Sequence, residues 1–263
     1  RNIYSVYAFA RIADDIADEM QGDEELRVGY LENLSRMILG IDDFLKNDIE
    51  NSNSQITKNP IMWALADTIV ERKLPRELFL KLLVAFKRDI RFVQAKGFQD
   101  LEDYCSYSAN PVGEIILRIF GLHDDKIKLY SDSVCTGLQL VNFWQDLSVD
   151  LTKGRCFIPQ ELLQKYGLEI NDLQLNEKSI NLRSCLDEIY DYTEEFFRNG
   201  RNLIGYLENA RLKLEIKATI LGGEQLLKKV RNLDTKIFVC RPQHNKIEIV
   251  KILLMMFFST WTH

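Results

Sequence analysis

The sequence predicts an all-α protein that forms one helical domain over residues 1–263. Apolar residues recur at helical spacing along most of the chain, strict two-residue alternation is rare, and only 5 prolines and 13 glycines interrupt the pattern. With 263 residues and a hydrophobic content of 46%, the chain can bury a substantial core. No internal repeat and no flexible linker is visible, so a single helical domain is the simplest organisation.

Prolines and glycines indicate the boundaries of the expected helices. Pro60 and Pro75 stand at first helical positions, while Gly97 and Gly121 follow two expected helix ends. The expected helices span residues 2–20, 24–45, 60–72, 76–96, 100–120, 126–151, 178–207, 211–230 and 246–258.

The charge balance argues against a nucleic-acid-binding protein. The net charge is −5 and the sequence pI is about 5.4, and no basic stripe runs along any segment. A negatively charged protein can still bind a phosphorylated ligand if divalent cations stand between its acidic groups and the phosphates.

Composition also bears on the cellular compartment. The 5 cysteines are widely spaced and include no C-x-x-C pair, so we expect free thiols in a reducing compartment. The apolar run 252–258 is too short to span a bilayer. We expect a cytoplasmic protein, in which the apolar residues 249–258 either contact the inner membrane face peripherally or pack against the domain.

The chain opens at Arg1 in a helical pattern without an initiating Met, and we expect further residues to precede it in the natural protein.

A first acidic motif lies near the start of the chain. In a helix, spacings of four, three and four residues place four polar side chains on one face, namely Tyr7, Arg11, Asp14 and Asp18. Asp15 adjoins them. Carboxylates one turn apart repel each other unless a cation compensates, and Mg²⁺ commonly bridges carboxylates to phosphate. The segment alone is equally consistent with a solvated acidic face on which Arg11 is an ordinary ion-pair partner.

A second acidic motif, in the expected helix 126–151, again places polar side chains on one helix face. Its polar stripe, spaced by about one helical turn, comprises Gln139, Asn142, Asp146 and Asp150. The rest of that helix is apolar nearly all round, which indicates burial, and buried carboxylates need partners or a metal. The alternative is a buried salt-bridge network, which is weaker because the stripe itself contains no lysine or arginine. Lys153 and Arg155 follow the stripe, where they suit either the helix dipole or a bound diphosphate.

The two motifs, read as Y-x-x-x-R-x-x-D-D-x-x-D and N-x-x-x-D-x-x-x-D-x-x-x-G-R, resemble those of the squalene/phytoene synthase family of head-to-head prenyl transferases. The resemblance extends over nearly the whole chain and includes Tyr104-Cys105 and Phe157-Ile158-Pro159. Within the family, the segments around residues 108–113 and 142–146 are similar to the bacterial branch that makes hydroxysqualene from presqualene diphosphate.

The resemblance implies a fold, a cofactor and residue roles. The implied fold is a helical bundle of the isoprenoid-synthase type around a central cavity, with the aspartate helices facing each other. The implied cofactor is Mg²⁺, as several ions that bridge to the diphosphate, and NADPH is not expected. The implied metal ligands are Asp14, Asp18, Asp146 and Asp150. The implied substrate-binding residues are Arg11, Asp15, Gln139, Asn142, Lys153 and Arg155. The implied catalytic residues are Tyr7, Arg11, Tyr104 and Asn110, and the small residues Ala8, Ala109, Gly113 and Gly137 would leave room for prenyl chains.

Two departures from the family pattern bear on the reaction. Gln145 stands where the family usually carries arginine, and Asn110 stands where it usually carries glycine. We expect Asn110, or a carbonyl freed by Pro111, to hold the water that quenches a carbocation; the alternative is that Asn110 satisfies a backbone group at a proline kink. Other possibilities are a squalene, dehydrosqualene or phytoene synthase that condenses two prenyl diphosphates, and a noncatalytic helical binding protein. A di-iron bundle is disfavoured because the three histidines lie away from both motifs.

Overall fold

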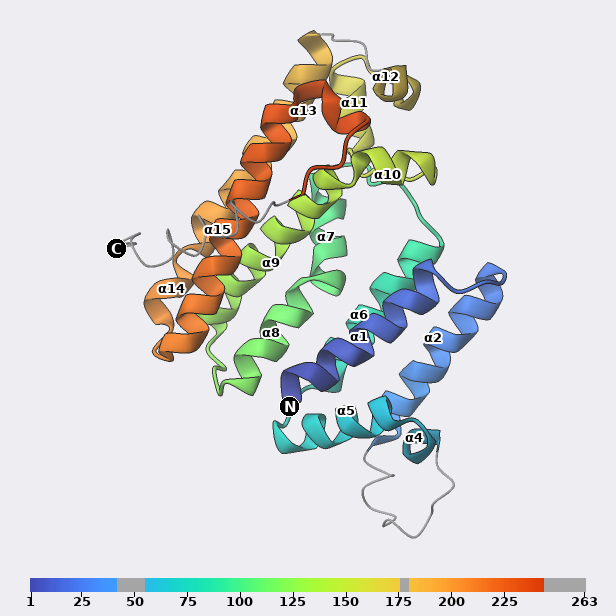
Figure 1. Cartoon of the computed structure of the whole chain (residues 1–263), viewed down its shortest axis with the longest axis vertical. Coiled ribbons are helices and arrows are strands. Elements are labelled where there is room, and N and C mark those ends of the chain that lie inside the picture. The colour runs from blue at the N-terminus through green and yellow to red at the C-terminus, as the bar shows by residue number, and fades with distance from the viewer. Residues whose placement is uncertain (42–54, 176–179, 244–263) are drawn as a thin grey trace. The chain divides into compact units, whose positions relative to one another are not determined.

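The computed structural model describes residues 1–41, 55–175 and 180–243. Over these ranges the chain consists of helices joined by turns and contains no β-strand (Figure 1). The all-α prediction is therefore confirmed. The expected helix 246–258 and the apolar tail 249–258 lie outside the described residues.

The helices group into two compact units, and each is described by itself. The first unit comprises residues 1–93 and 106–124. Its helices are α1 (Asn2–Asp18), α2 (Glu24–Leu39), α4 (Gln55–Lys58), α5 (Pro60–Glu71), α6 (Arg76–Ile90) and α8 (Asn110–Ile119).

The second unit comprises residues 94–105 and the chain from residue 125 onward. Helix α7 (Phe98–Ser108) begins in it and ends in the first unit. The other helices of the second unit are α9 (Asp125–Gln145), α10 (Leu147–Thr152), α11 (Gln160–Lys165), α12 (Ile170–Leu175), α13 (Ile180–Gly200), α14 (Leu203–Tyr206), α15 (Ala210–Leu233) and the 3₁₀ helix η1 (Asp234–Phe238).

The core of the first unit fixes which face of α1 is buried. Helix α1 packs against α2, α5 and α6 through Val6, Phe9, Ala13 and Ala17. The rings of Phe9 and Phe79 meet edge to face with centroids 5.8 Å apart. Because these apolar residues face the core, the acidic side of α1 is turned away from it.

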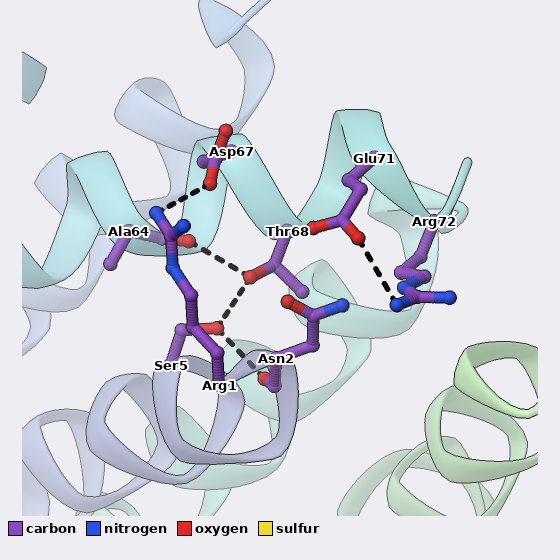
Figure 2. A network of polar contacts seen from close by, with 8 residues as sticks. All are labelled: Arg1, Asn2, Ser5, Ala64, Asp67, Thr68, Glu71 and Arg72. Carbon is purple, nitrogen blue, oxygen red and sulfur yellow. Dashed lines mark hydrogen bonds and ion pairs between the residues drawn. The ribbon is translucent and has the colours of Figure 1, made fainter.

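A polar network ties the start of α1 to α5 (Figure 2). The hydroxyl oxygens of Ser5 and Thr68 are 2.7 Å apart and buried, and the Thr68 hydroxyl donates to the Ala64 carbonyl. At the surface, the Arg1 guanidinium pairs with Asp67 at 2.8 Å. Buried polar groups that are paired in this way specify one docking geometry. The network therefore holds α1 in a fixed rotation against α5.

In the second unit, α13 and α15 lie alongside α9 and pack closely on it (Figure 1). The Trp144 indole donates to the Thr193 hydroxyl at 2.8 Å in a fully buried contact. Close approach depends on glycine: a Cβ on Gly223 would lie 2.6 Å from Phe197, and one on Gly200 would lie 2.6 Å from Val134. A Cβ on Gly137 would lie 3.3 Å from the Phe197 ring. The described contacts of Gly137 thus support close helix packing instead of the room for a prenyl chain that the resemblance implied.

Several helix boundaries differ from the prediction. Helix α6 ends at Ile90 and not at residue 96. The carbonyls of Ala95 and Lys96 accept hydrogen bonds from the amides of Gln160 and Glu161, both at 2.9 Å. These carbonyls thereby satisfy two amides at the start of α11, a helix that the prediction missed. A contact with a distant segment therefore holds the backbone after α6, and helical periodicity carries no signal for such a contact.

Other long predicted helices are divided. The expected helix 100–120 is interrupted at Ala109, and Pro111 lies in the first turn of α8. The expected helix 126–151 is interrupted at Asp146, between α9 and α10. The expected helix 178–207 consists of α13 and α14, and α12 was not predicted.

Candidate active site

The first acidic motif occupies the face of α1 that the core leaves uncovered. Tyr7, Arg11 and Asp18 are exposed, and Asp14 and Asp15 are half-buried. The predicted common face is confirmed, because the buried residues of α1 lie on its other side. The motif is therefore accessible for binding within its own unit.

Arg11 is surrounded by the carboxylates of its own helix. Its guanidinium lies 2.9 Å from Asp14, 2.7 Å from Asp15 and 3.1 Å from Glu19. Nevertheless, partial burial and the neighbouring Asp18 raise the pKa of Asp14, and the charge of Arg11 offsets this only in part. Asp15 in particular, together with the other carboxylates, raises the pKa of Arg11. The motif thus has more negative charge than Arg11 neutralises, which favours an added cation.

The second motif lies where α9 passes into α10. The amide of Asp146 still donates to the Asn142 carbonyl at 3.0 Å, and the amide of Asp150 donates to the Asp146 carbonyl at 2.9 Å. Helical spacing therefore persists across the interruption, and the three side chains keep a common side. Asn142 is exposed, whereas Gln139, Asp146 and Asp150 are half-buried. Leu140 and Trp144 of α9 are fully buried, and further residues along this helix are buried as well, in agreement with the expected burial.

The basic residues after the second motif are positioned by a glycine turn. Gly154 has a φ of +73°, a left-handed conformation that glycine adopts without strain. The amide of Arg155 donates to the Asp150 carbonyl at 2.9 Å, and the amide of Gly154 donates to the Leu151 carbonyl at 3.1 Å. This is a Schellman closure of α10. It ties the backbone of Arg155 to that of Asp150, while Lys153 stays exposed.

Tyr104 belongs to an aromatic cluster beside the second motif. The rings of Phe143 and Phe157 are stacked with centroids 3.9 Å apart, and the Tyr104 ring lies 5.5 Å from Phe143 and 6.4 Å from Phe157. Phe143 directly follows Asn142, and Phe157 lies two residues after Arg155. An aromatic surface of this kind can stabilise positive charge.

Asn110 is the first residue of α8 in the first unit, and its side chain is half-buried. The adjoining Val112 amide donates to the Ala109 carbonyl at 3.0 Å. Asn110 therefore lies at a helix break beside Pro111, as expected, although this break separates two helices and does not bend a single one.

Arg241 is a site residue that the sequence did not predict. Its Nη2 donates to Oδ2 of Asp146 at 3.0 Å, and its Nε forms an ion pair with Oδ1 of the same carboxylate. The two residues are 95 positions apart. Gln145 stands where the family usually carries arginine, so a positive charge is missing beside Asp146. No local sequence pattern indicates which distant arginine supplies that charge. The salt-bridge alternative for this stripe is thus correct for Asp146 in the structure.

The residues suit Mg²⁺ in their chemistry. Oδ1 of Asp15 and Oδ1 of Asp146 are buried and accept no hydrogen bond from the described residues, although each has an arginine nitrogen at ion-pair distance. Within the described ranges, no three His, Cys, Asp or Glu side chains gather into a metal cluster. Mg²⁺ is compatible with this, because it uses one or two carboxylates together with water and phosphate oxygens.

Comparison with known proteins identifies the family. A model of the squalene/phytoene synthase family matches residues 1–248. The chain belongs to this family. Its members process prenyl diphosphates in isoprenoid biosynthesis. The prediction from the two motifs is therefore confirmed at the level of the family.

Individual relatives of the squalene/phytoene synthase family agree with this. The hydroxysqualene synthase of Rhodopseudomonas palustris is 29% identical over 233 residues, which cover 88% of this chain and 75% of that protein. The presqualene diphosphate synthase of Zymomonas mobilis is 25% identical, covering 97% and 83%. The crystal structure of squalene synthase HpnC from Alicyclobacillus acidocaldarius has 34% sequence identity and a TM-score of 0.78, covering 89% and 83%.

A helix that crosses a membrane must be long and apolar. None of the helices in the described part of the chain is long and apolar enough to cross a bilayer. Peripheral contact through residues 249–258 stays a prediction.

Proposed function

We propose that the protein is a Mg²⁺-dependent synthase that ionises presqualene diphosphate and quenches the carbocation with water to give hydroxysqualene. The observation that carries the proposal is the second motif, in which Asp146 and Asp150 follow each other by one helical turn and the Gly154 turn ties Arg155 to Asp150. The similarity to hydroxysqualene synthases over most of the chain supports the choice of product.

The roles of the residues follow from their charges. Asp14, Asp18, Asp146 and Asp150 would hold Mg²⁺, which would supply positive charge to the departing diphosphate. Arg11, Lys153 and Arg155 bind and orient the same anion, and Gln139 and Asn142 donate hydrogen bonds to it from their exposed or half-exposed positions. Tyr7 and Asp15 support this binding from α1.

The aromatic cluster acts on the carbocation and not on the diphosphate. The rings of Tyr104, Phe143 and Phe157 lie together directly beside the second motif, within 6.4 Å of one another. We infer that they stabilise the carbocation and exclude bulk water. Asn110 or a carbonyl near Pro111 then positions the one water that attacks.

Product identification tests the proposal. The protein is incubated with Mg²⁺ and either presqualene diphosphate or farnesyl diphosphate, with and without NADPH. We expect hydroxysqualene from presqualene diphosphate, independent of NADPH. Squalene, dehydrosqualene or phytoene from farnesyl diphosphate would favour the condensing alternative. Binding of pyrophosphate without any turnover would favour a noncatalytic protein.

An Asn110→Gly variant separates the family assignment from the water-holding role. We expect its products to shift from the alcohol towards eliminated or rearranged hydrocarbons, while the rate of pyrophosphate release is largely kept. Hydroxysqualene as the sole product of this variant would contradict the role of Asn110 and leave the rest of the proposal in place.

A further inference from the structure

The segment that carries Arg241 is fastened to the second unit independently of Asp146. We call residues 239–243 the strap. The Val239 and Cys240 amides donate to the Lys236 carbonyl at 3.1 and 3.0 Å, which starts the strap at the end of η1. Further along, Gln145 Nε2 donates to the Pro242 carbonyl at 2.6 Å.

A second fastening comes from α15. Lys229 Nζ donates to the Gln243 carbonyl at 2.5 Å. The strap thus has one anchor on α9 and one on α15, and both anchors hold backbone carbonyls. Neither requires the Arg241 side chain, so the strap backbone can stay in place while that side chain moves.

Arg241 covers both oxygens of Asp146. Nη2 donates to Oδ2 at 3.0 Å and Nε forms an ion pair with Oδ1, so the planar fork of the guanidinium faces both carboxylate oxygens. The Asp146 side chain is 18% exposed and that of Arg241 is 44% exposed. A hard cation at the same carboxylate needs direct contact with an oxygen and repels the guanidinium. Arg241 and such a cation therefore compete for Asp146.

We propose that Gln145 is a positioning residue that holds the strap so that Arg241 is the resident counter-ion of Asp146, and that Arg241 must leave this carboxylate when a divalent cation binds. The proposal rests on the proposed function only in taking Asp146 as a cation ligand. Its consequence is that the ion-free protein keeps Asp146 neutralised, and that the strap weakens cation binding by the free energy of the ion pair.

The test measures cation binding in the absence of any diphosphate. Mn²⁺ replaces Mg²⁺ because both prefer oxygen ligands, and free Mn²⁺ is followed by electron paramagnetic resonance. The variants are Arg241→Gln, Arg241→Lys, Gln145→Met and, as a charge-matched control, Arg198→Gln. Arg198 pairs with Glu195 on the exposed surface of α13. Thermal melts without Mn²⁺ check that each variant is folded.

We expect Arg241→Gln to bind Mn²⁺ about two- to fivefold more tightly, the range that a partly exposed ion pair contributes. Gln145→Met keeps every charge but lacks the donor to Pro242, so we expect a smaller change in the same direction. Arg241→Lys keeps the charge without the fork and should lie between wild type and Arg241→Gln. Arg198→Gln should match the wild type.

The outcomes separate this proposal from the proposed function. Equal affinity in all proteins, or weaker binding by Arg241→Gln, overturns the counter-ion role. An unchanged Gln145→Met beside a tighter Arg241→Gln overturns the positioning role of Gln145. Absence of Mn²⁺ binding in every protein overturns both this proposal and the metal part of the proposed function. The expected affinity pattern without hydroxysqualene formation overturns the proposed product alone.

Discussion

Asp14 combines a proposed functional role with a cost in stability. Its neighbour Asp18 lies one turn away on the same exposed face of α1, and partial burial and this neighbour raise the pKa of Asp14. A carboxyl whose pKa is raised by folding binds protons more tightly in the native state than in the unfolded state. Stability therefore falls as the pH rises from the ordinary pKa of 3.8 through the raised value, and the loss persists at neutral pH.

Replacing Asp14 by asparagine should separate these two effects. In metal-free protein at pH 7, we expect Asp14→Asn to melt at a higher temperature than the wild type, because repulsion with Asp18 is removed. Turnover should fall by about a hundredfold or more, because one charged ligand is lost from the proposed metal site. Thermal melts and a pyrophosphate-release assay measure the two.

The pH dependence supplies the control for this variant. Below the ordinary pKa of 3.8 both proteins carry an uncharged group at position 14, so the difference in melting temperature should shrink there. A variant that is less stable than the wild type at pH 7 would show that the ion pair with Arg11 outweighs the repulsion. Unchanged turnover would contradict the metal role of Asp14.

At the scale of helices, neighbouring glycines in α15 have opposite surroundings. An added Cβ at Gly223 would lie 2.6 Å from the Phe197 ring and 2.8 Å from Leu138. At Gly222 it would meet no heavy atom within 4 Å. Phe197 is 1% exposed and has little room to shift. Gly222 is thus an ordinary helical position, whereas Gly223 permits α9, α13 and α15 to pack together.

Alanine at each of these positions gives a matched pair. We expect Gly222→Ala to increase the free energy of unfolding by up to about 1 kcal/mol, through the better helix propensity of alanine. Gly223→Ala should decrease it by about 1–3 kcal/mol, through overpacking against Phe197. Denaturant unfolding of both variants measures the difference. A Gly223→Ala protein as stable as Gly222→Ala would contradict the close packing of these helices.

For the molecule as a whole, ligand binding should appear as added thermal stability. Any ligand that binds the native state alone stabilises it by mass action, by about 2.7 kcal/mol at a hundredfold excess over its dissociation constant. We expect Mg²⁺ with inorganic pyrophosphate to raise the melting temperature by on the order of 5 °C. Pyrophosphate with a chelator, and the Asp150→Asn variant with both ligands, should show a much smaller rise. Equal rises with and without Mg²⁺ would contradict metal-dependent binding.

Whole-chain organisation shows where sequence reasoning was sufficient. The helical period predicted the all-α class, and the spacing of Asp14 and Asp18 predicted their common face, because the helix repeat alone fixes which residues share a side. The placement of Arg155 beside Asp150 was also local, since a glycine in the left-handed conformation closes the helix within five residues. The 5 cysteines, all within the described residues, form no disulfide in the structure.

Other features depended on contacts between distant parts of the chain. Helix α6 ends at Ile90, and the backbone that follows it satisfies amides of α11, some 65 residues onward. Arg241 reaches Asp146 across 95 residues, through a strap that Gln145 and Lys229 fasten. The sequence by itself determined the helical class, the two acidic faces and the family. Only the tertiary structure decided which cation covers Asp146, because helical periodicity carries no information about which distant charge a fold brings to a given carboxylate.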